Sequence, residues 1–170
     1  MFKQGRIIFA AALAALCAAC ATATSPVATL SANSEIVLIG ADETISIGQD
    51  WLAGASRQSV TMSMHGQEHR FEGVPLVHLL DLAGAPTGPA LRGEALSTIV
   101  LITARDGYQV VLSLGEADPA LSGRTIVVAD AKDGAPLSGE EGPYWLIVVG
   151  DRRAARSARM IERIEIRTVE

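Results

Sequence analysis

The residues best suited to holding a small ligand are concentrated near the C-terminus. Six arginines lie in residues 152–167, namely Arg152, Arg153, Arg156, Arg159, Arg163 and Arg167. A guanidinium makes paired hydrogen bonds to anionic groups and to polar planar heterocycles, and its flat face stacks on rings. In an acidic protein we interpret Arg152, Arg153 and Arg163 as solvated surface charges. For Arg156 and Arg159, a ligand contact and a surface charge stand as equal alternatives.

Two aromatic residues, Tyr144 and Trp145, are neighbours in an expected strand over residues 144–149. Successive residues of a strand face opposite sides, so one ring should enter the core. The other ring could form a stacking wall for a flat ligand, a contact worth about 0.5–1.5 kcal/mol beyond burial. Core packing is the commoner use of a tryptophan in a strand, and ligand stacking is the alternative.

Two carboxylates are further candidates. Asp106 lies in an expected turn just before Tyr108, and its oxygens suit the amino and ring N–H groups of a heterocycle. The alternative is a turn residue paired with Gly107. Glu141 lies beside Glu140, where a solvated loop acid is the simple interpretation.

Metal-binding and nucleophilic motifs are sparse. Both cysteines, Cys17 and Cys20, lie in the first 20 residues, so the rest of the chain offers no thiolate as soft metal ligand or nucleophile. His65 and His69 are four residues apart, but in an expected hairpin rather than the helix on which that spacing makes a zinc pair. The sequence contains neither a Gly-x-Ser-x-Gly elbow nor a glycine-rich phosphate loop. We therefore expect no protein-ligated metal and assign no catalytic residue.

The N-terminus resembles an export signal. Lys3 and Arg6 precede an apolar run over residues 7–21, which is shorter than the roughly 20 residues of a spanning helix. Ala21-Thr22-Ala23 fits a signal-peptidase site, which predicts a signal peptide over residues 1–23. In the alternative, Cys20 is the lipidated residue of a lipoprotein leader, although Cys17 stands where an aliphatic residue is usual. Both alternatives predict a periplasmic or other extracytoplasmic location, soluble or lipid-anchored.

A flexible linker is expected over residues 24–33, followed by one domain over residues 34–170. Removing residues 1–23 takes away Lys3 and Arg6, which leaves 12 basic and 19 acidic residues and a net charge of −7. This charge argues against a nucleic-acid partner. Contact with a membrane is expected only through a lipid on Cys20.

The apolar pattern predicts an α+β domain with a mixed or mostly antiparallel sheet and a few short helices. The expected strands cover residues 35–39, 59–64, 69–71, 98–104, 108–113, 125–129, 144–149 and 160–169. The expected helices cover residues 51–55, capped by Asp50, residues 75–83, ended by Gly84, and residues 114–121. Gly73-Val74-Pro75 should interrupt the strand before the second helix.

Several segments in order resemble the molybdopterin-binding domain of the sulfite-oxidase-like family. The matching segments are Phe71-Glu72-Gly73-Val74-Pro75-Leu76, Asp106-Gly107-Tyr108, Asp133-Gly134-Ala135-Pro136-Leu137, Glu141-Gly142-Pro143 with residues 146–150, and Ala155-Arg156-Ser157-Ala158-Arg159-Met160-Ile161. The resemblance covers residues 60–167 and implies that family's fold. It also implies that Arg156, Ser157, Arg159, Asp106, Tyr108, Trp145 and Glu141 line a cleft for a pterin or molybdopterin.

The departures from the family pattern concern the metal. The strand over residues 59–64, where the family places its metal-ligating cysteine, has none. Glu141, Leu146 and Met160 stand where the family usually has His, Arg and Trp. The resemblance therefore implies an exported pterin-binding protein that acts as a periplasmic sensor for a membrane-bound signalling enzyme. The alternatives are a molybdopterin-dependent oxidoreductase subunit without a protein cysteine ligand, and a scaffold that has lost ligand binding.

Overall fold

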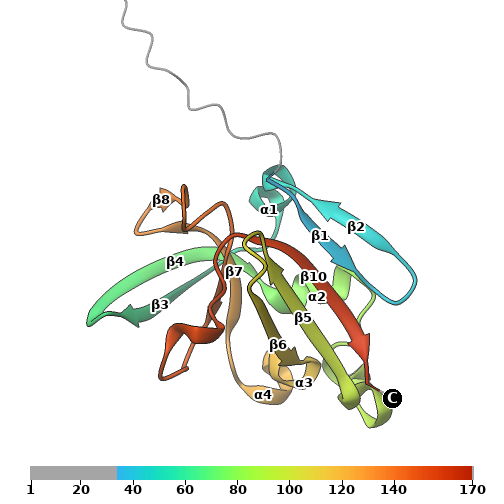
Figure 1. Cartoon of the computed structure of the whole chain (residues 1–170). Coiled ribbons are helices and arrows are strands. Elements are labelled where there is room, and N and C mark those ends of the chain that lie inside the picture. The colour runs from blue at the N-terminus through green and yellow to red at the C-terminus, as the bar shows by residue number, and fades with distance from the viewer. Residues whose placement is uncertain (1–33, 170) are drawn as a thin grey trace, which may run out of the picture. The chain divides into compact units, whose positions relative to one another are not determined.

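The computed structural model describes residues 34–169. The predicted leader over residues 1–23, with Cys20, and the linker over residues 24–33 lie outside the described residues. Two five-stranded sheets form the domain (Figure 1). Sheet A has the order β2-β1-β10-β5-β6, and sheet B has the order β3-β4-β7-β8 with β9 also on β7. Sheet A comprises β1 (Ile36–Ile39), β2 (Thr44–Ile47), β5 (Thr98–Ala104), β6 (Gln109–Ser113) and β10 (Ile161–Thr168). Sheet B comprises β3 (Gln58–Met64), β4 (Gln67–Pro75), β7 (Ile126–Lys132), β8 (Ala135–Pro136) and β9 (Trp145–Val148).

Both sheets are largely antiparallel, and only the pairing of β1 with β10 is parallel among the described strands. Alternation explains the strands, since in β6 the second and fourth residues, Val110 and Leu112, are buried while their neighbours are exposed. The mixed α+β architecture predicted from the sequence is therefore confirmed.

The helices are short and lie at the ends of strands. They are α1 (Gln49–Gly54), α2 (Leu76–Leu82), α3 (Leu114–Ala117), α4 (Pro119–Ser122) and the 3-10 turns η1 (Gly88–Ala90), η2 (Gly93–Ser97) and η3 (Ala154–Arg156). The expected cap Asp50 is wrong: α1 begins two residues earlier than expected, with Gly48 at the cap and Asp50 in its first turn. The expected helix over residues 114–121 is two helices, because the side chain of Asp118 caps α4 at Pro119. None of the described helices is long and apolar enough to cross a bilayer.

The expected break at Gly73-Val74-Pro75 is also wrong, because β4 continues through Pro75. A shift in pairing between Glu72 and Gly73 accommodates the irregularity. A Cβ at Gly73 would overlap the backbone carbonyl of Val128 on β7, so glycine permits the close approach of the two strands.

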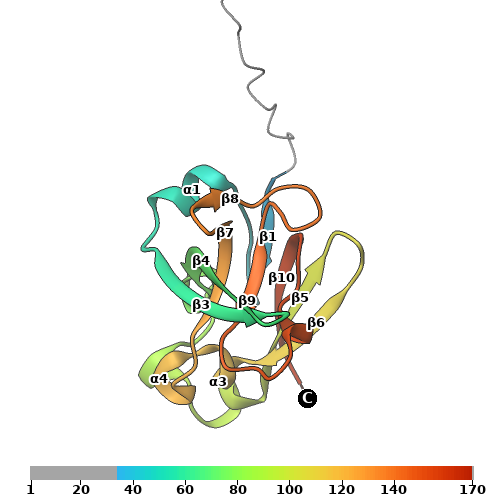
Figure 2. The ribbon, with the colours of Figure 1, turned by 90° about the vertical axis from the view of Figure 1, so that its left-hand side faces the viewer.

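Two apolar clusters form the core. The larger contains Tyr144 and α2, whose Leu76, Leu79 and Leu80 are buried, and the smaller contains Trp145 with Phe71, Met62 and Met64. Apart from Leu137, the buried residues of the smaller cluster lie on β3, β4, β7 and β9, the strands of sheet B that Figure 2 labels with β8. The neighbours Tyr144 and Trp145 thus belong to different clusters, as alternation predicts.

Candidate functional site

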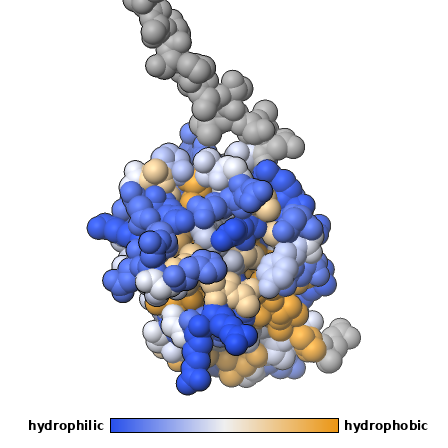
Figure 3. All heavy atoms as spheres, turned by 60° about the vertical axis from the view of Figure 1, so that its left-hand side comes forward, coloured by the Kyte–Doolittle hydropathy of each residue, from blue (hydrophilic) through white to orange (hydrophobic). Residues whose placement is uncertain are grey.

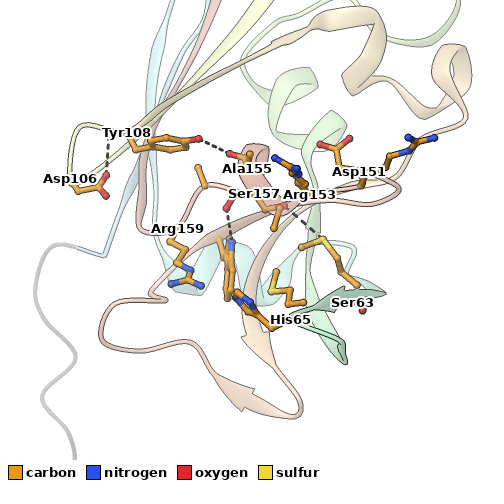
Figure 4. Close-up of a pocket in the computed structure, with 15 residues that line it drawn as sticks. Ser63, His65, Asp106, Tyr108, Asp151, Arg153, Ala155, Ser157 and Arg159 are labelled. Carbon is orange, nitrogen blue, oxygen red and sulfur yellow. Dashed lines mark hydrogen bonds between the residues drawn. The ribbon is translucent and has the colours of Figure 1, made fainter.

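A cavity of about 550 Å³ lies where the tip of the β3–β4 hairpin, the β5–β6 turn and the loop over residues 151–159 meet. Its size falls within the roughly 300–1,000 Å³ range of small-molecule sites. Figure 4 shows side chains from these three segments around it. The lining residues are Met62, Ser63, Met64, His65, Asp106, Tyr108, Trp145, Asp151, Arg152, Arg153, Ala154, Ala155, Ser157, Ala158 and Arg159. Of the seven predicted site residues, Asp106, Tyr108, Trp145, Ser157 and Arg159 lie here.

Trp145 forms the floor of the cavity. Its side chain is 1% exposed and meets Phe71 edge to face, with ring centroids 5.2 Å apart. The Arg159 guanidinium lies over the indole, 4.5 Å from its centroid, a distance at which cation and ring attract. Both Trp145 and Tyr144 are buried, in agreement with core packing, the commoner of the two alternatives, and neither ring forms an exposed wall. At this point of the cavity the Arg159 guanidinium covers the Trp145 indole, so the guanidinium is the group that faces the cavity.

Ser157 fastens the loop to β9. Its carbonyl oxygen accepts the indole N–H of Trp145 at 2.9 Å, and its hydroxyl accepts the Val148 N–H at 3.2 Å. The backbone of the next residue, Ala158, accepts the Leu146 N–H at 2.8 Å. These bonds hold the backbone beside Arg159 at a fixed distance from β9, and so place its side chain over the indole of Trp145.

Asp106 and Tyr108 close the opposite wall. The Asp106 carboxylate accepts the Tyr108 N–H at 2.9 Å within the β5–β6 turn. The Tyr108 hydroxyl donates to the Ala155 carbonyl at 2.6 Å, while the side chain is 49% exposed. Tyr108 therefore ties the β5–β6 turn to the loop and still offers a ring to solvent.

The charged side chains that line the cavity are mainly cationic. Arg152, Arg153 and Arg159 line the cavity, and no carboxylate among residues 34–169 pairs with any of them. Asp151, by contrast, is held by Arg156 at 2.6 Å and by Arg124 at 3.4 Å. Figure 3 shows one face of the domain, which is mostly hydrophilic, with hydrophobic side chains gathered toward the lower right. The unpaired guanidiniums favour an anionic or acceptor-rich ligand.

Two predicted residues lie away from the cavity lining. The Arg156 guanidinium turns to Asp151 and to Glu116 of α3, 2.9 Å away, and these bonds raise its pKa. The same hydrogen bonds from Arg156 lower the pKa of Asp151. Glu141 accepts two hydrogen bonds from Lys132, at 3.0 and 3.1 Å.

Four lining residues at the β3–β4 hairpin are not among the predicted site residues, namely Met62, Ser63, Met64 and His65. The sequence did indicate that this strand belongs to the site, since the resemblance places the family's metal-ligating cysteine in the strand over residues 59–64. His65 has a φ of 52° at the hairpin turn. The other hairpin histidine, His69, bonds Asp133 at 2.7 Å. In the described part of the chain, no three His, Cys, Asp or Glu residues gather as metal ligands.

No protein-family model matches the sequence, and no curated protein matches it. Among solved structures, the chain is similar to one from the crystal structure of the sulfane dehydrogenase SoxCD from Paracoccus pantotrophus, with a TM-score of 0.61 and 16% identity. The match covers 80% of this chain and 39% of that chain, so this chain spans well under half of that protein's length. At this identity the likeness concerns the fold alone, and it confirms the predicted sulfite-oxidase-like α+β fold.

Proposed function

We propose that this chain is an exported binding protein for a pterin-type heterocycle, acting in the periplasm as a sensor module for a membrane-bound signalling partner. The observation that carries the ligand class is Arg159, an exposed cation seated on the Trp145 ring without a carboxylate partner in the described residues. A flat polar ring would stack on this guanidinium, and its acceptors would pair with Arg152 and Arg153. Export rests on the sequence of residues 1–23, and the signalling partner rests on the family resemblance.

Titration of the purified chain with reduced and oxidised pterins tests this proposal. Trp145 lies beneath the expected ligand, so saturable binding should change its fluorescence, and a Trp51→Phe variant assigns the signal to Trp145. Calorimetry should give one site per chain. Absence of saturable binding to any pterin, in a protein with a cooperative melt, would overturn the ligand class.

A second candidate is a molybdopterin-dependent oxidoreductase subunit, which the fold likeness to a sulfane dehydrogenase chain favours. The cavity residues fit the pterin part of such a cofactor. They do not supply a thiolate for its metal, because Cys17 and Cys20 both precede residue 34 and the hairpin offers the thioethers of Met62 and Met64. Stoichiometric molybdenum in protein from a cofactor-producing host would favour this candidate, and binding of metal-free pterin would favour the sensor.

A further inference from the structure

The strand β3 is a free edge of sheet B. Among the described residues it pairs with β4 alone, and it has seven residues, against four in β2 and five in β6, the edges of sheet A. β9 is different, because the 157–159 segment bonds along it through the Trp145–Arg159 bridge. Proteins protect sheet edges by keeping the edge strand short or by covering it, and within residues 34–169 β3 is neither short nor covered.

The register shows which backbone groups of β3 point outward. His65 and Gly66 form a two-residue turn closed by Met64 and Gln67, a pair that exchanges hydrogen bonds. Alternation then makes Met62–His69 and Val60–Phe71 bonded pairs. The N–H and C=O groups of Ser59, Thr61 and Ser63 point away from β4, and no described residue bonds them.

The side chains of this edge are self-complementary. The segment Gln58–Met64 contains no charged residue and no proline, the usual devices against edge pairing. If a second β3 lies antiparallel with Thr61 opposite Thr61, then Ser59 meets Ser63 and Val60 meets Met62. The hydroxyl residues gather on the exposed face, and the apolar residues extend the smaller core cluster.

We propose that two copies of this chain pair through β3 about a two-fold axis at Thr61, which joins their two B sheets into one. Such a contact is isologous and closed, so it gives a dimer rather than a fibre. It would also place Gln58 of the partner subunit opposite Met64, at the rim of the cavity. The proposal rests on the edge geometry and is independent of which ligand the cavity holds.

Sedimentation of the full chain over a concentration series tests the proposal. The wild type should sediment as a monomer–dimer equilibrium, and Thr61→Lys should weaken self-association at least about tenfold by opposing like charges at the axis. Thr61→Pro should do the same while leaving the β3–β4 ladder intact, because the Thr61 N–H points outward. Val111→Lys, which adds the same charge on β6, is the matched control and should leave the dimer unchanged.

A Thr61→Cys variant supplies a positional readout. Under oxidation it should give a disulfide between the two residues 61, identified by peptide mass, since paired strands hold opposite Cα atoms within disulfide reach. A wild-type chain that stays monomeric at its highest soluble concentration would overturn the proposal. A dimer that survives both Thr61→Lys and Thr61→Pro would overturn it equally, because its interface would lie elsewhere.

Discussion

Arg156 and Asp151 close the cavity loop on itself through a paired contact. Nη2 of Arg156 bonds Oδ1 of Asp151 at 2.6 Å, and Nε bonds Oδ2 at 2.8 Å. The third nitrogen reaches Glu116 on α3 at 2.9 Å. The planar fork thus ties the end of the turn η3 to Asp151, which precedes the turn, and to Glu116 on α3. We conclude that Arg156 positions the loop, while Arg159 faces the cavity.

Replacing Arg156 should therefore loosen the loop. We expect Arg156→Ala to lower the free energy of unfolding by about 1–2 kcal/mol, a modest value because the side chain is 33% exposed. Arg156→Lys should recover little of it, since an ammonium cannot make the paired contact. Urea unfolding measures both, with Arg92→Ala as an exposed control outside the cavity. Full recovery in the lysine variant would show that charge alone matters.

The Arg156–Asp151 contact also predicts a dependence of stability on pH. Hydrogen bonding to Arg156 lowers the pKa of Asp151 in the folded chain. Its contribution is therefore present above the unfolded carboxyl pKa of about 4 and is lost as pH falls through the lower folded value. Asp151→Asn should flatten the decline of the unfolding free energy below about pH 5. Urea unfolding at several pH values measures this dependence. Parallel curves of unfolding free energy against pH for the wild type and Asp151→Asn would contradict the prediction. The hydrogen bond from His69 also lowers the pKa of Asp133. This second carboxylate contributes equally to the pH dependence of the wild type and of Asp151→Asn, so it does not affect the comparison.

Arg159 should separate ligand affinity from stability. Its guanidinium is exposed and unpaired with any described carboxylate, so Arg159→Ala should leave the melting temperature nearly unchanged. The same change should weaken pterin binding at least about tenfold, because it removes the stacking surface and a charged donor. Calorimetric titration and thermal melts of one preparation give both quantities. A similar loss of both would identify a structural arginine and count against the proposed site.

The elements were predictable where one local pattern decided them. The strands over residues 59–64 and 98–104 follow from alternation and from an apolar run, and Gly84 ends α2 with a φ of 78°. The two-residue β8 carries no pattern of its own, because it exists only through pairing with Ala131 and Lys132. The expected helix over residues 114–121 is divided because Asp118 ends α3 and caps α4, and helix ends are weakly coded.

The site was predictable in its composition and less so in its orientation. Arg156 and Arg159 are alike in sequence, and only the bridge between Trp145 and Arg159 decides which one meets the cavity. Glu141 finds Lys132 from the neighbouring strand β7, a partner nine residues away that no motif indicates. The contribution of Met62, Met64 and His65 depends on where the hairpin tip lies, which is a tertiary property.

Gly73 gives a sharp test of how closely β4 and β7 approach beneath the smaller core cluster. An added Cβ would overlap the Val128 carbonyl and crowd Cα of Ala129, and backbone atoms cannot move aside as a flexible side chain can. We expect Gly73→Ala to destabilise the domain by about 2–3 kcal/mol, in the range of overpacked interiors. Gly54→Ala is the matched control, because no atom lies within 4 Å of its added Cβ and its φ is not positive. Urea unfolding of the two variants measures the difference. Equal stabilities of the two variants would show that β4 and β7 can move apart at little cost. The position of Trp145 on β9, which pairs with β7, would then be less rigid than the described contacts require.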